Sequence, residues 1–208
     1  MKYDEYMKKL GEGWQYTAYD LGDGRVLKKF HSLPRMYWVI LKDISPFNSD
    51  PLPFYKLPSF ARASKRKALE SFEILKHKNI PASWLGNPKR LKGLDYEQDK
   101  IKPLHDVFEE NNTEVIKSII DQFIIFNREL LELGVIDKSF NVTKNYGLSK
   151  KGEMVMIDFG ELLADPVRIN KRCQVRAWSE HYVAGCIKDQ EAQEYFIKKM
   201  DENFGTKA

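Results

Sequence analysis

The sequence predicts an α+β fold, with a small β-rich part followed by a mostly helical part. Two short stretches, 16–21 and 25–30, have strand character and are joined by a Gly-Asp-Gly turn signal at 22–24. Apolar residues of 115–133 recur at helical spacing. Strands that precede helices in this way are typical of an α+β chain, and we expect the division near Pro103.

The first part alternates between loop, helix and strand. Five of the nine prolines lie in residues 33–58, so the second half of this stretch is predicted to be a long loop. Residues 61–77 show helical periodicity, which predicts an amphipathic helix. The short apolar stretches 82–85 and 94–101 predict two further strands.

The second part is helical apart from one strand. The helix over 115–133 is expected to end at Gly134, because glycine suits the position after a helix. Residues 154–157 form a short apolar stretch that predicts a strand. Residues 178–204 predict one or two closing helices.

Composition places the chain among ordinary soluble proteins. Its 208 residues, 42% hydrophobic and 31% charged, suit one compact domain or two small lobes. Two cysteines favour a reducing compartment, and we expect a cytoplasmic protein without a cleavable secretory signal or a membrane span. The net charge of +4 is mild, and the absence of zinc-finger spacing or an RNA-recognition signature argues against nucleic-acid binding.

The strongest chemical signal is Asp-Phe-Gly at residues 158–160. It follows the apolar stretch 154–157 directly, so the Asp158 carboxylate is expected at the end of a strand. A carboxylate there can reach into a cleft and bind Mg²⁺, which prefers oxygen ligands. Asp-Phe-Gly alone is often a plain turn with a buried phenylalanine, and the preceding strand makes the motif more specific.

The stretch from the end of the predicted long helix to Asn145 resembles the catalytic loop of protein kinases. In that family an aspartate takes the acceptor's proton, and an asparagine that follows it binds a metal ion. The resemblance implies that Asp137 is the catalytic base and that Asn145 binds metal together with Asp158. The spacing departs from the family, because Asp137 precedes Asn145 by eight residues rather than five. Ser139 aligns with the family's aspartate, and Asn141 competes with Asn145 for the metal.

The N-terminal residues resemble the glycine-rich loop and lysine-bearing strand of the same family. Gly11 and Gly13 would let backbone amides approach the phosphates of ATP, although the family's third glycine is missing. Strand alternation places Val26 and Lys28 on one face. The resemblance then implies that Val26 packs on the adenine and Lys28 binds phosphate, while a shift of one residue would give Lys29 that role.

Two further segments complete the resemblance. The helix over 61–77 would supply a glutamate to the lysine, with Glu70 preferred to Glu73. The stretch after residue 94 resembles the segment between the kinase lobes. There, backbone groups of Lys100, Ile101 and Lys102 would hold the adenine edge.

These segments occur once each and in family order, which implies a two-lobed protein-kinase-like fold. Residues 1–102 would form a small β lobe and residues 103–208 a minimal helical lobe. The stretch after Gly160 is short and lacks Ala-Pro-Glu, and residues 161–177 contain no Ser, Thr or Tyr that could be phosphorylated. This truncation resembles the small effector kinases that bacterial pathogens deliver into host cells, and most of all the Hop-type effectors that phosphorylate the host ninety-kilodalton heat-shock chaperone.

The resemblance implies a monomeric protein kinase that uses ATP and Mg²⁺ and acts on a protein hydroxyl, in the host cytosol if the chain is secreted. A small-molecule phosphotransferase of the aminoglycoside- or choline-kinase kind is one alternative. Such enzymes usually have a larger acidic C-terminal lobe. A pseudokinase, which binds nucleotide without transfer, is the other alternative, favoured by the missing His-Arg-Asp and third glycine. An interaction protein using the proline- and aromatic-rich residues 36–60 would be a third.

Overall fold

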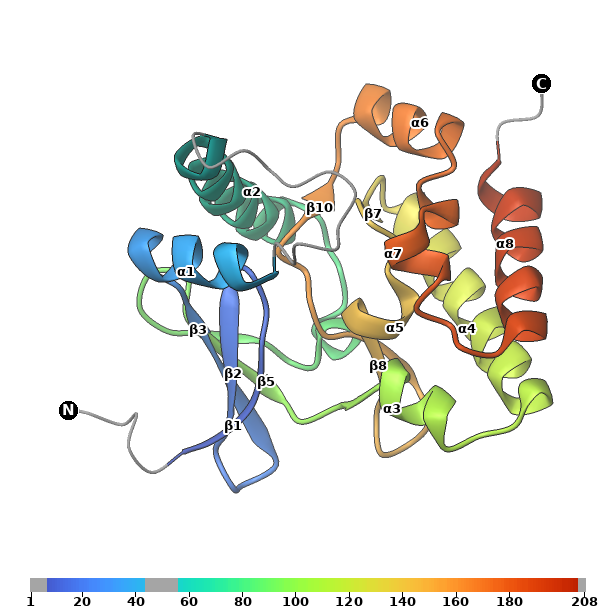
Figure 1. The fold of residues 1–208 in the computed structure, drawn as a ribbon, viewed down its shortest axis with the longest axis horizontal. Helices are drawn as coiled ribbons and strands as arrows, with labels where there is room; N and C mark the ends of the chain where they lie inside the picture. The colour runs from blue at the N-terminus through green and yellow to red at the C-terminus, as the bar shows by residue number, and fades with distance from the viewer. Residues whose placement is uncertain (1–6, 44–55, 206–208) are drawn as a thin grey trace. The chain divides into compact units, whose positions relative to one another are not determined.

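The structure is a computed structural model, and it describes residues 7–43 and 56–205. The chain divides into two compact units. The first contains residues 1–70 and 87–100, and the second contains residues 71–86 and 101–208. The predicted α+β class is confirmed, since the described residues form small antiparallel sheets together with helices (Figure 1).

The first unit is built on a five-stranded sheet whose described pairs are all antiparallel. In sheet order the strands are β1 (Lys8–Glu12), β2 (Tyr16–Asp20), β3 (Arg25–Phe30), β5 (Tyr96–Asp99) and β4 (Lys89–Arg90). The strands predicted at 16–21, 25–30 and 94–101 are thus confirmed as β2, β3 and β5. The β2–β3 turn requires glycine, because Gly22 and Gly24 have φ of 80° and 83°.

Two helices pack on each other and on the end of β3. They are α1 (Leu33–Asp43) and α2 (Leu57–His77), and they share a core of Met36, Ile40, Leu57 and Ala61 against which Phe30 packs (Figure 1). The helix predicted over 61–77 is confirmed and begins earlier, at Leu57. Sequence reasoning missed α1, and residues 44–55 of the predicted proline-rich loop lie outside the described residues.

The strand predicted at 82–85 is wrong. These residues form the 3₁₀ helix η2 (Ala82–Leu85), in which only Leu85 is buried. Gly86 ends it with φ of 67°, and its N–H bonds to the carbonyls of Ala82 and Ser83. An apolar run of four residues does not distinguish a strand from a turn of helix, and the glycine that follows decides the outcome.

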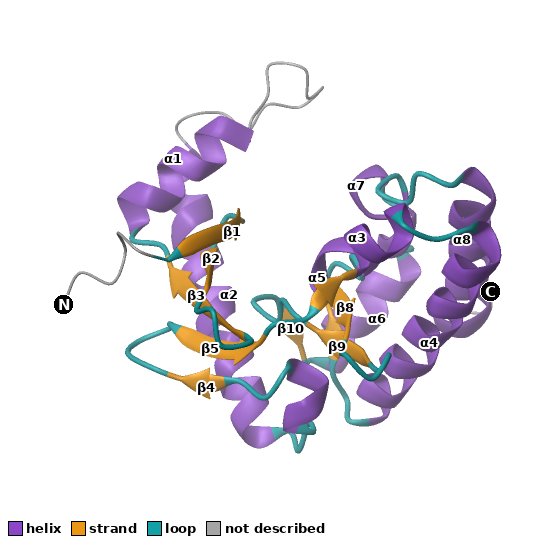
Figure 2. Ribbon diagram, turned by 90° about the horizontal axis from the view of Figure 1, so that it is seen from below, coloured by secondary structure: helices purple, strands orange, loops and turns teal. Residues whose placement is uncertain are grey.

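The second unit centres on two long helices that run side by side, α4 (Thr113–Glu132) and α8 (Gln190–Phe204) (Figure 2). Their inner faces bury large side chains, and the rings of Phe123 and Phe196 meet at 5.9 Å. The predicted helix and its end are confirmed, since Gly134 follows α4 with φ of 71°. The shorter helices of this unit are α3 (Leu104–Glu109), α5 (Val142–Asn145), α6 (Pro166–Gln174), η3 (Ala177–Ser179) and α7 (His181–Ala184).

Two small antiparallel ladders complete the second unit. One has the order β6 (Lys102–Pro103), β8 (Tyr146–Leu148) and β9 (Met154–Met156), and the other pairs β7 (Ile136–Asp137) with β10 (Leu162–Leu163). The strand predicted at 154–157 is confirmed as β9. In the described part of the chain, no helix is both long and apolar enough to cross a bilayer.

Candidate active site

Three predicted site residues meet in the second unit, although they come from three different segments. Asp137 ends β7, Asn145 ends α5, and Asp158 follows β9 by two residues. The backbone carbonyl of Asn145 accepts hydrogen bonds from the N–H groups of Ile157 (2.7 Å) and Asp158 (3.2 Å). The segment that carries Asp158 is therefore fastened directly to Asn145.

The Asp137 carboxylate is held by hydrogen bonds on both oxygens. Its Oδ1 accepts from the backbone N–H and from the hydroxyl of Ser139, each at 3.0 Å. Its Oδ2 accepts from Asn145 Nδ2 at 3.0 Å, and the same amide donates to Ser139 Oγ at 3.0 Å. Asp137, Ser139 and Asn145 therefore form one connected polar cluster.

Burial dominates the electrostatics of Asp137, whose exposed fraction is 2%. The pKa of its carboxyl is raised from 3.8 to about 6, chiefly by loss of hydration and to a smaller extent by the nearby charge of Asp158. The hydrogen bonds from Ser139 and Asn145 act in the opposite direction. A carboxylate with a pKa just below neutrality suits proton abstraction at pH 7.

Asn145 rather than Asn141 lies beside Asp137. The Asn141 side chain is buried and caps α5, accepting hydrogen bonds from Lys144 N and Thr143 Oγ1 at 3.2 Å each. Its oxygen is thus used to begin a helix. Of the two asparagines that the sequence left open, Asn145 is the one whose side chain contacts Asp137.

A buried polar pair behind Asp137 was missed by sequence reasoning. The Tyr146 hydroxyl donates to Asn127 Oδ1 at 3.0 Å, and Asn127 Nδ2 donates to the Phe123 carbonyl at 3.0 Å. Burial, followed by the charge of Asp137, raises the pKa of Tyr146 well above its usual value. The only available signal was an asparagine on the apolar face of the predicted long helix.

The residues after Asp158 are also fixed. Asp158 Oδ1 accepts a hydrogen bond from Gly160 N at 3.1 Å, and the ring of Phe159 meets Phe72 edge-on at 6.0 Å. Ser71 Oγ accepts from Leu162 N at 2.9 Å, which places the start of β10. The phenylalanine of the motif is thus a buried anchor for the residue that precedes it.

Charged residues join this segment to the loop around Asp137. Lys138 Nζ lies 2.9 Å from Glu161, and the Lys138 N–H donates to the Glu161 carbonyl at 3.1 Å. From α6, Arg172 Nε donates to the Lys138 carbonyl at 2.9 Å. These contacts order both segments without a phosphate group.

The predicted phosphate-binding residues lie in the first unit. Gly11 ends an irregularity in the β1–β2 register, and a Cβ there would meet no atom within 4 Å, whereas one at Gly13 would meet only the Tyr16 carbonyl at 4.0 Å. Neither glycine is required by sterics, and the Gly13 N–H already donates to the Tyr16 carbonyl at 2.9 Å. Val26 is buried and Lys28 half-buried on the same face of β3, as strand alternation predicts.

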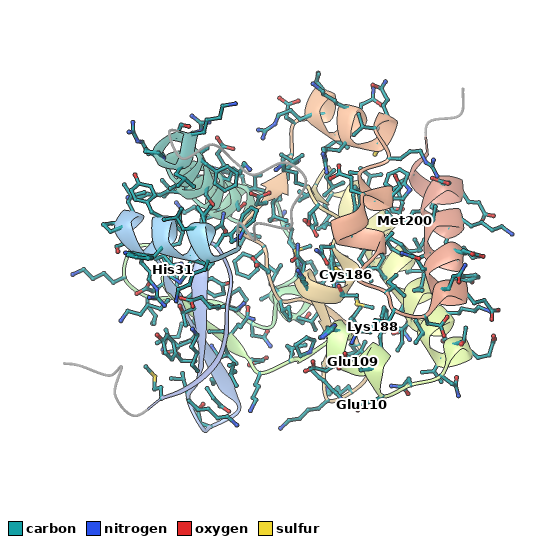
Figure 3. The ribbon with its side chains drawn as sticks, viewed as in Figure 1. His31, Glu109, Glu110, Cys186, Lys188 and Met200 are labelled. Carbon is teal, nitrogen blue, oxygen red and sulfur yellow. The ribbon has the colours of Figure 1, made fainter. Side chains whose placement is uncertain are left out.

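The turn that contains Gly13 is tied down by polar contacts. Glu12 binds Arg35 and Lys9, and these hydrogen bonds lower its pKa to about 2. His31 (labelled in Figure 3) is buried, contacts Thr17 Oγ1 at 2.7 Å and the Trp14 carbonyl at 3.1 Å, and has its pKa lowered by that burial. The chain on either side of Gly13 is therefore well anchored.

The remaining predicted residues have the following contacts. Glu70 lies 3.7 Å from Arg66, whereas Glu73 lies 2.6 Å from Lys76. Lys100 pairs with Asp20 at 2.6 Å and its N–H donates to the Gly24 carbonyl. Ile101 and Lys102 lead into β6, where Lys102 pairs with Leu148.

Asn145 and Asp158, joined by a backbone hydrogen bond, carry an amide oxygen and a carboxylate, and oxygen donors of this kind fit Mg²⁺. This ion usually keeps several waters and takes one or two protein carboxylates plus phosphate oxygens. Among the described residues, no group of three or more His, Cys, Asp or Glu side chains could hold a metal ion. A two-residue site that relies on phosphate oxygens is compatible with that finding.

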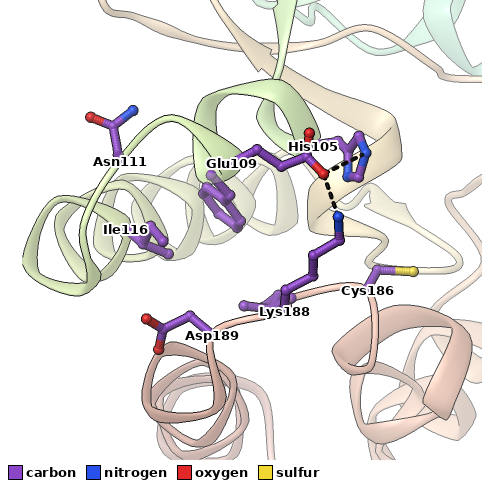
Figure 4. A pocket seen from close by; sticks show the side chains of 9 residues that line it. His105, Glu109, Asn111, Ile116, Cys186, Lys188 and Asp189 are labelled. Atoms are coloured by element: carbon purple, nitrogen blue, oxygen red, sulfur yellow. Dashed lines mark hydrogen bonds and ion pairs between the residues drawn. The ribbon is translucent and has the colours of Figure 1, made fainter.

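A separate pocket of about 450 Å³ lies between α3 and the residues before α8. Glu109 is its central charge and binds both Lys188 and, at 3.5 Å, His105 (Figure 4). The lining residues include none of the predicted site residues. Lys188 pairs with Glu109, and the carboxylate of Asp189, which also lines the pocket, accepts hydrogen bonds from Thr113 Oγ1 and Ala192 N.

Comparison with known proteins assigns this chain to no family. No family model and no curated protein matches the chain. Among solved structures, the chain is similar to the complex structure of Rv3197-erythromycin from Mycobacterium tuberculosis, at 15% identity and a TM-score of 0.43. The match covers 94% of this chain and 53% of the other, so this chain spans about half the length of that protein.

Proposed function

We propose that the protein is an ATP- and Mg²⁺-dependent phosphotransferase with a two-lobed protein-kinase-like fold. The observation that carries the proposal is the meeting of Asp137, Asn145 and Asp158, joined by hydrogen bonds of Asn145 to the other two segments. Phosphoryl transfer requires a group that takes the acceptor's proton and oxygen ligands for a cation that neutralises phosphate charge. Following the family resemblance, we assign the acceptor's proton to Asp137 as its final destination and the cation to Asn145 and Asp158.

Most of the proposed nucleotide-binding residues belong to the first unit, whereas Ile101 and Lys102 belong to the second. The turn that contains Gly11 and Gly13 approaches the phosphates, Val26 packs on adenine, and Lys28 pairs with the α- and β-phosphates. The backbone of Lys100, Ile101 and Lys102 holds the adenine edge. We assign Glu70 as the partner of Lys28 because both belong to the first unit, whereas Glu73 belongs to the second.

The proposed acceptor is a protein hydroxyl. The helix α6, which follows Gly160, carries basic and no acidic side chains, and this charge disfavours a cationic small molecule as the acceptor. The resemblance to bacterial effector kinases makes a host protein, with the ninety-kilodalton heat-shock chaperone as the first candidate, the proposed substrate. The proposal extends to a monomer that acts in the cytosol.

A pseudokinase is the second candidate function, and one observation favours it. Asp137 is 2% exposed and both of its oxygens are hydrogen-bonded within the chain. An acceptor hydroxyl has no direct access to such a carboxylate. Binding of nucleotide without transfer would be consistent with this geometry.

Labelled ATP distinguishes these functions. The purified protein is incubated with γ-labelled ATP, Mg²⁺ and either a mixed lysate or purified chaperone, and Asp158→Ala serves as the control. A labelled protein band that Asp158→Ala fails to give supports the kinase, and label on small molecules supports the alternative phosphotransferase. Nucleotide binding without any transfer would establish the pseudokinase and overturn the proposal.

A further inference from the structure

The carboxylate of Asp137 is buried, whereas the Ser139 hydroxyl that is hydrogen-bonded to it is partly exposed. Asp137 is 2% exposed, but Ser139 is only half-buried. Ser139 also stands where the family resemblance places its catalytic aspartate. We propose that Ser139 is a catalytic residue, whose hydroxyl takes the proton of the phosphoryl acceptor and passes its own proton to Asp137.

The hydrogen bonds around Ser139 have the directions that such a relay requires. Ser139 Oγ donates to Asp137 Oδ1 at 3.0 Å, so its proton already points at the carboxylate. Asn145 Nδ2 donates to the same Oγ at 3.0 Å, which fixes the hydroxyl's orientation. The remaining contact, from Asn141 N, is long at 3.3 Å and is the one that an acceptor hydroxyl would replace.

The step balances without an additional reactant. The acceptor's O–H bond breaks as its oxygen bonds to the γ-phosphorus, and ADP leaves with the electrons of the P–O bond. The acceptor's proton binds Ser139 Oγ while the original Ser139 proton moves to Asp137 Oδ1. Asp137 then releases that proton to solvent, and Ser139 ends as it began.

This inference rests on the proposed function, and it also explains how a buried carboxylate could act in it. The test uses slow release of phosphate from Mg-ATP with water in place of the acceptor, so no substrate has to be identified. Ser139→Ala removes the hydroxyl, Ser139→Thr keeps it, and Ser179→Ala removes an exposed hydroxyl elsewhere in the second unit. Thermal unfolding and the affinity for Mg-ADP are measured for each variant.

We expect Ser139→Ala to lose about 100-fold in rate, because general-base assistance contributes about 10²–10⁴. Ser139→Thr should stay within about fivefold of the wild type, and Ser179→Ala should be unchanged. Combining Ser139→Ala with Asp137→Asn should lose no more than the worse single variant, since the two residues act in one step.

The two proposals fail in different ways. Phosphate release by the wild type that Asp158→Ala abolishes and Ser139→Ala leaves intact would overturn the relay alone. A stable phosphate on Ser139, or equal losses in Ser139→Ala and Ser139→Thr with weakened Mg-ADP binding, would also overturn it. A wild type that binds Mg-ADP but releases no phosphate would overturn the proposed function and the relay with it.

Discussion

At the residue scale, Asp137 links the chemistry of the site to the stability of the fold. A carboxylate buried among polar groups is retained although it opposes folding at neutral pH. Its surroundings, in particular Ser139, Asn145 and Tyr146, keep it hydrogen-bonded or close to polar groups. Such a group is expected where function, rather than packing, determines the residue.

The stability of the Asp137→Asn variant, relative to that of the wild type, should increase as pH rises. The folded pKa of about 6 exceeds the usual 3.8, so the folded state binds this proton more tightly than the unfolded state. The contribution of Asp137 to the free energy of unfolding is therefore most favourable below pH 4. It decreases by about 3 kcal/mol as pH rises to 6. Urea unfolding of both proteins between pH 4 and 8 measures this difference, and a constant difference across that range would contradict it.

Lys28 and Lys29 should differ sharply in function. Lys28 lies on the Val26 face of β3, whereas Lys29 lies on the opposite face. Lys28→Met should lower phosphate transfer by at least about 100-fold, which corresponds to about 3 kcal/mol of barrier, and Lys29→Met should have a small effect. Initial rates at saturating ATP provide the measurement, and the reverse ranking would show that the phosphate lysine is Lys29.

At the element scale, the β6–β8 ladder depends on a glycine. A Cβ at Gly147 would lie 2.4 Å from the Lys102 carbonyl oxygen and 2.6 Å from Ile101 Cγ2. Gly147→Ala should therefore destabilise the protein by about 1–3 kcal/mol through overpacking against backbone. Gly11→Ala, which meets no atom within 4 Å, is the matched control and should leave the free energy of unfolding within about 0.5 kcal/mol. Equal unfolding midpoints for the two variants would refute this.

The segment that follows Asp158 should not need phosphorylation to become ordered. Lys138 already pairs with Glu161, and Arg172 binds the Lys138 backbone. Residues 161–177 also have no hydroxyl that could receive phosphate. Protein made in bacteria and treated with a broad phosphatase should keep its full transfer rate, with dephosphorylation checked by intact mass. A loss that preincubation with ATP restores would show a phosphosite elsewhere.

At the scale of the whole molecule, the last helix supports the loop around Asp137. Phe204 at the end of α8 lies 5.6 Å from the ring of Phe140, which is fully buried and has φ of 52°. That left-handed backbone costs about 1–2 kcal/mol in a bulky residue, so packing must hold it. Phe204→Ala should lower stability by about 3–5 kcal/mol and reduce transfer in the surviving folded protein. Thermal unfolding and rates below the transition test both effects, and unchanged activity would show that the loop keeps its geometry without the Phe204 ring.

Much of the fold follows from the sequence, because strand alternation, helical periodicity and glycine turns are local signals. The helices α2 and α4 and the strands β2, β3, β5 and β9 were predicted from such signals. The α1 helix and the 3₁₀ helix at 82–85 were not, since short apolar runs fit several structures.

The arrangement of the site was harder to predict because it depends on contacts between residues that are separated in the sequence. Asp137 precedes Asn145 by eight residues, whereas the protein-kinase motif separates its aspartate and asparagine by five. The family spacing therefore argues against pairing these two residues. The intervening α5 is a single turn of helix that brings the two side chains within 3.0 Å. The support from Tyr146 and Asn127 likewise depends on packing that no local pattern records.

Because Trp178 is buried, its fluorescence can report on the loop around Asp137. Its ring is fully buried against Phe140 and its indole N–H bonds to Asp201, whereas Trp14 and Trp38 are 44% and 64% exposed. Emission from a buried indole lies at shorter wavelength than emission from an indole in water and responds to movement of nearby groups. Changing the other tryptophans to phenylalanine would leave one native chromophore, and nucleotide titrations could then follow the Asp137 loop without any attached dye.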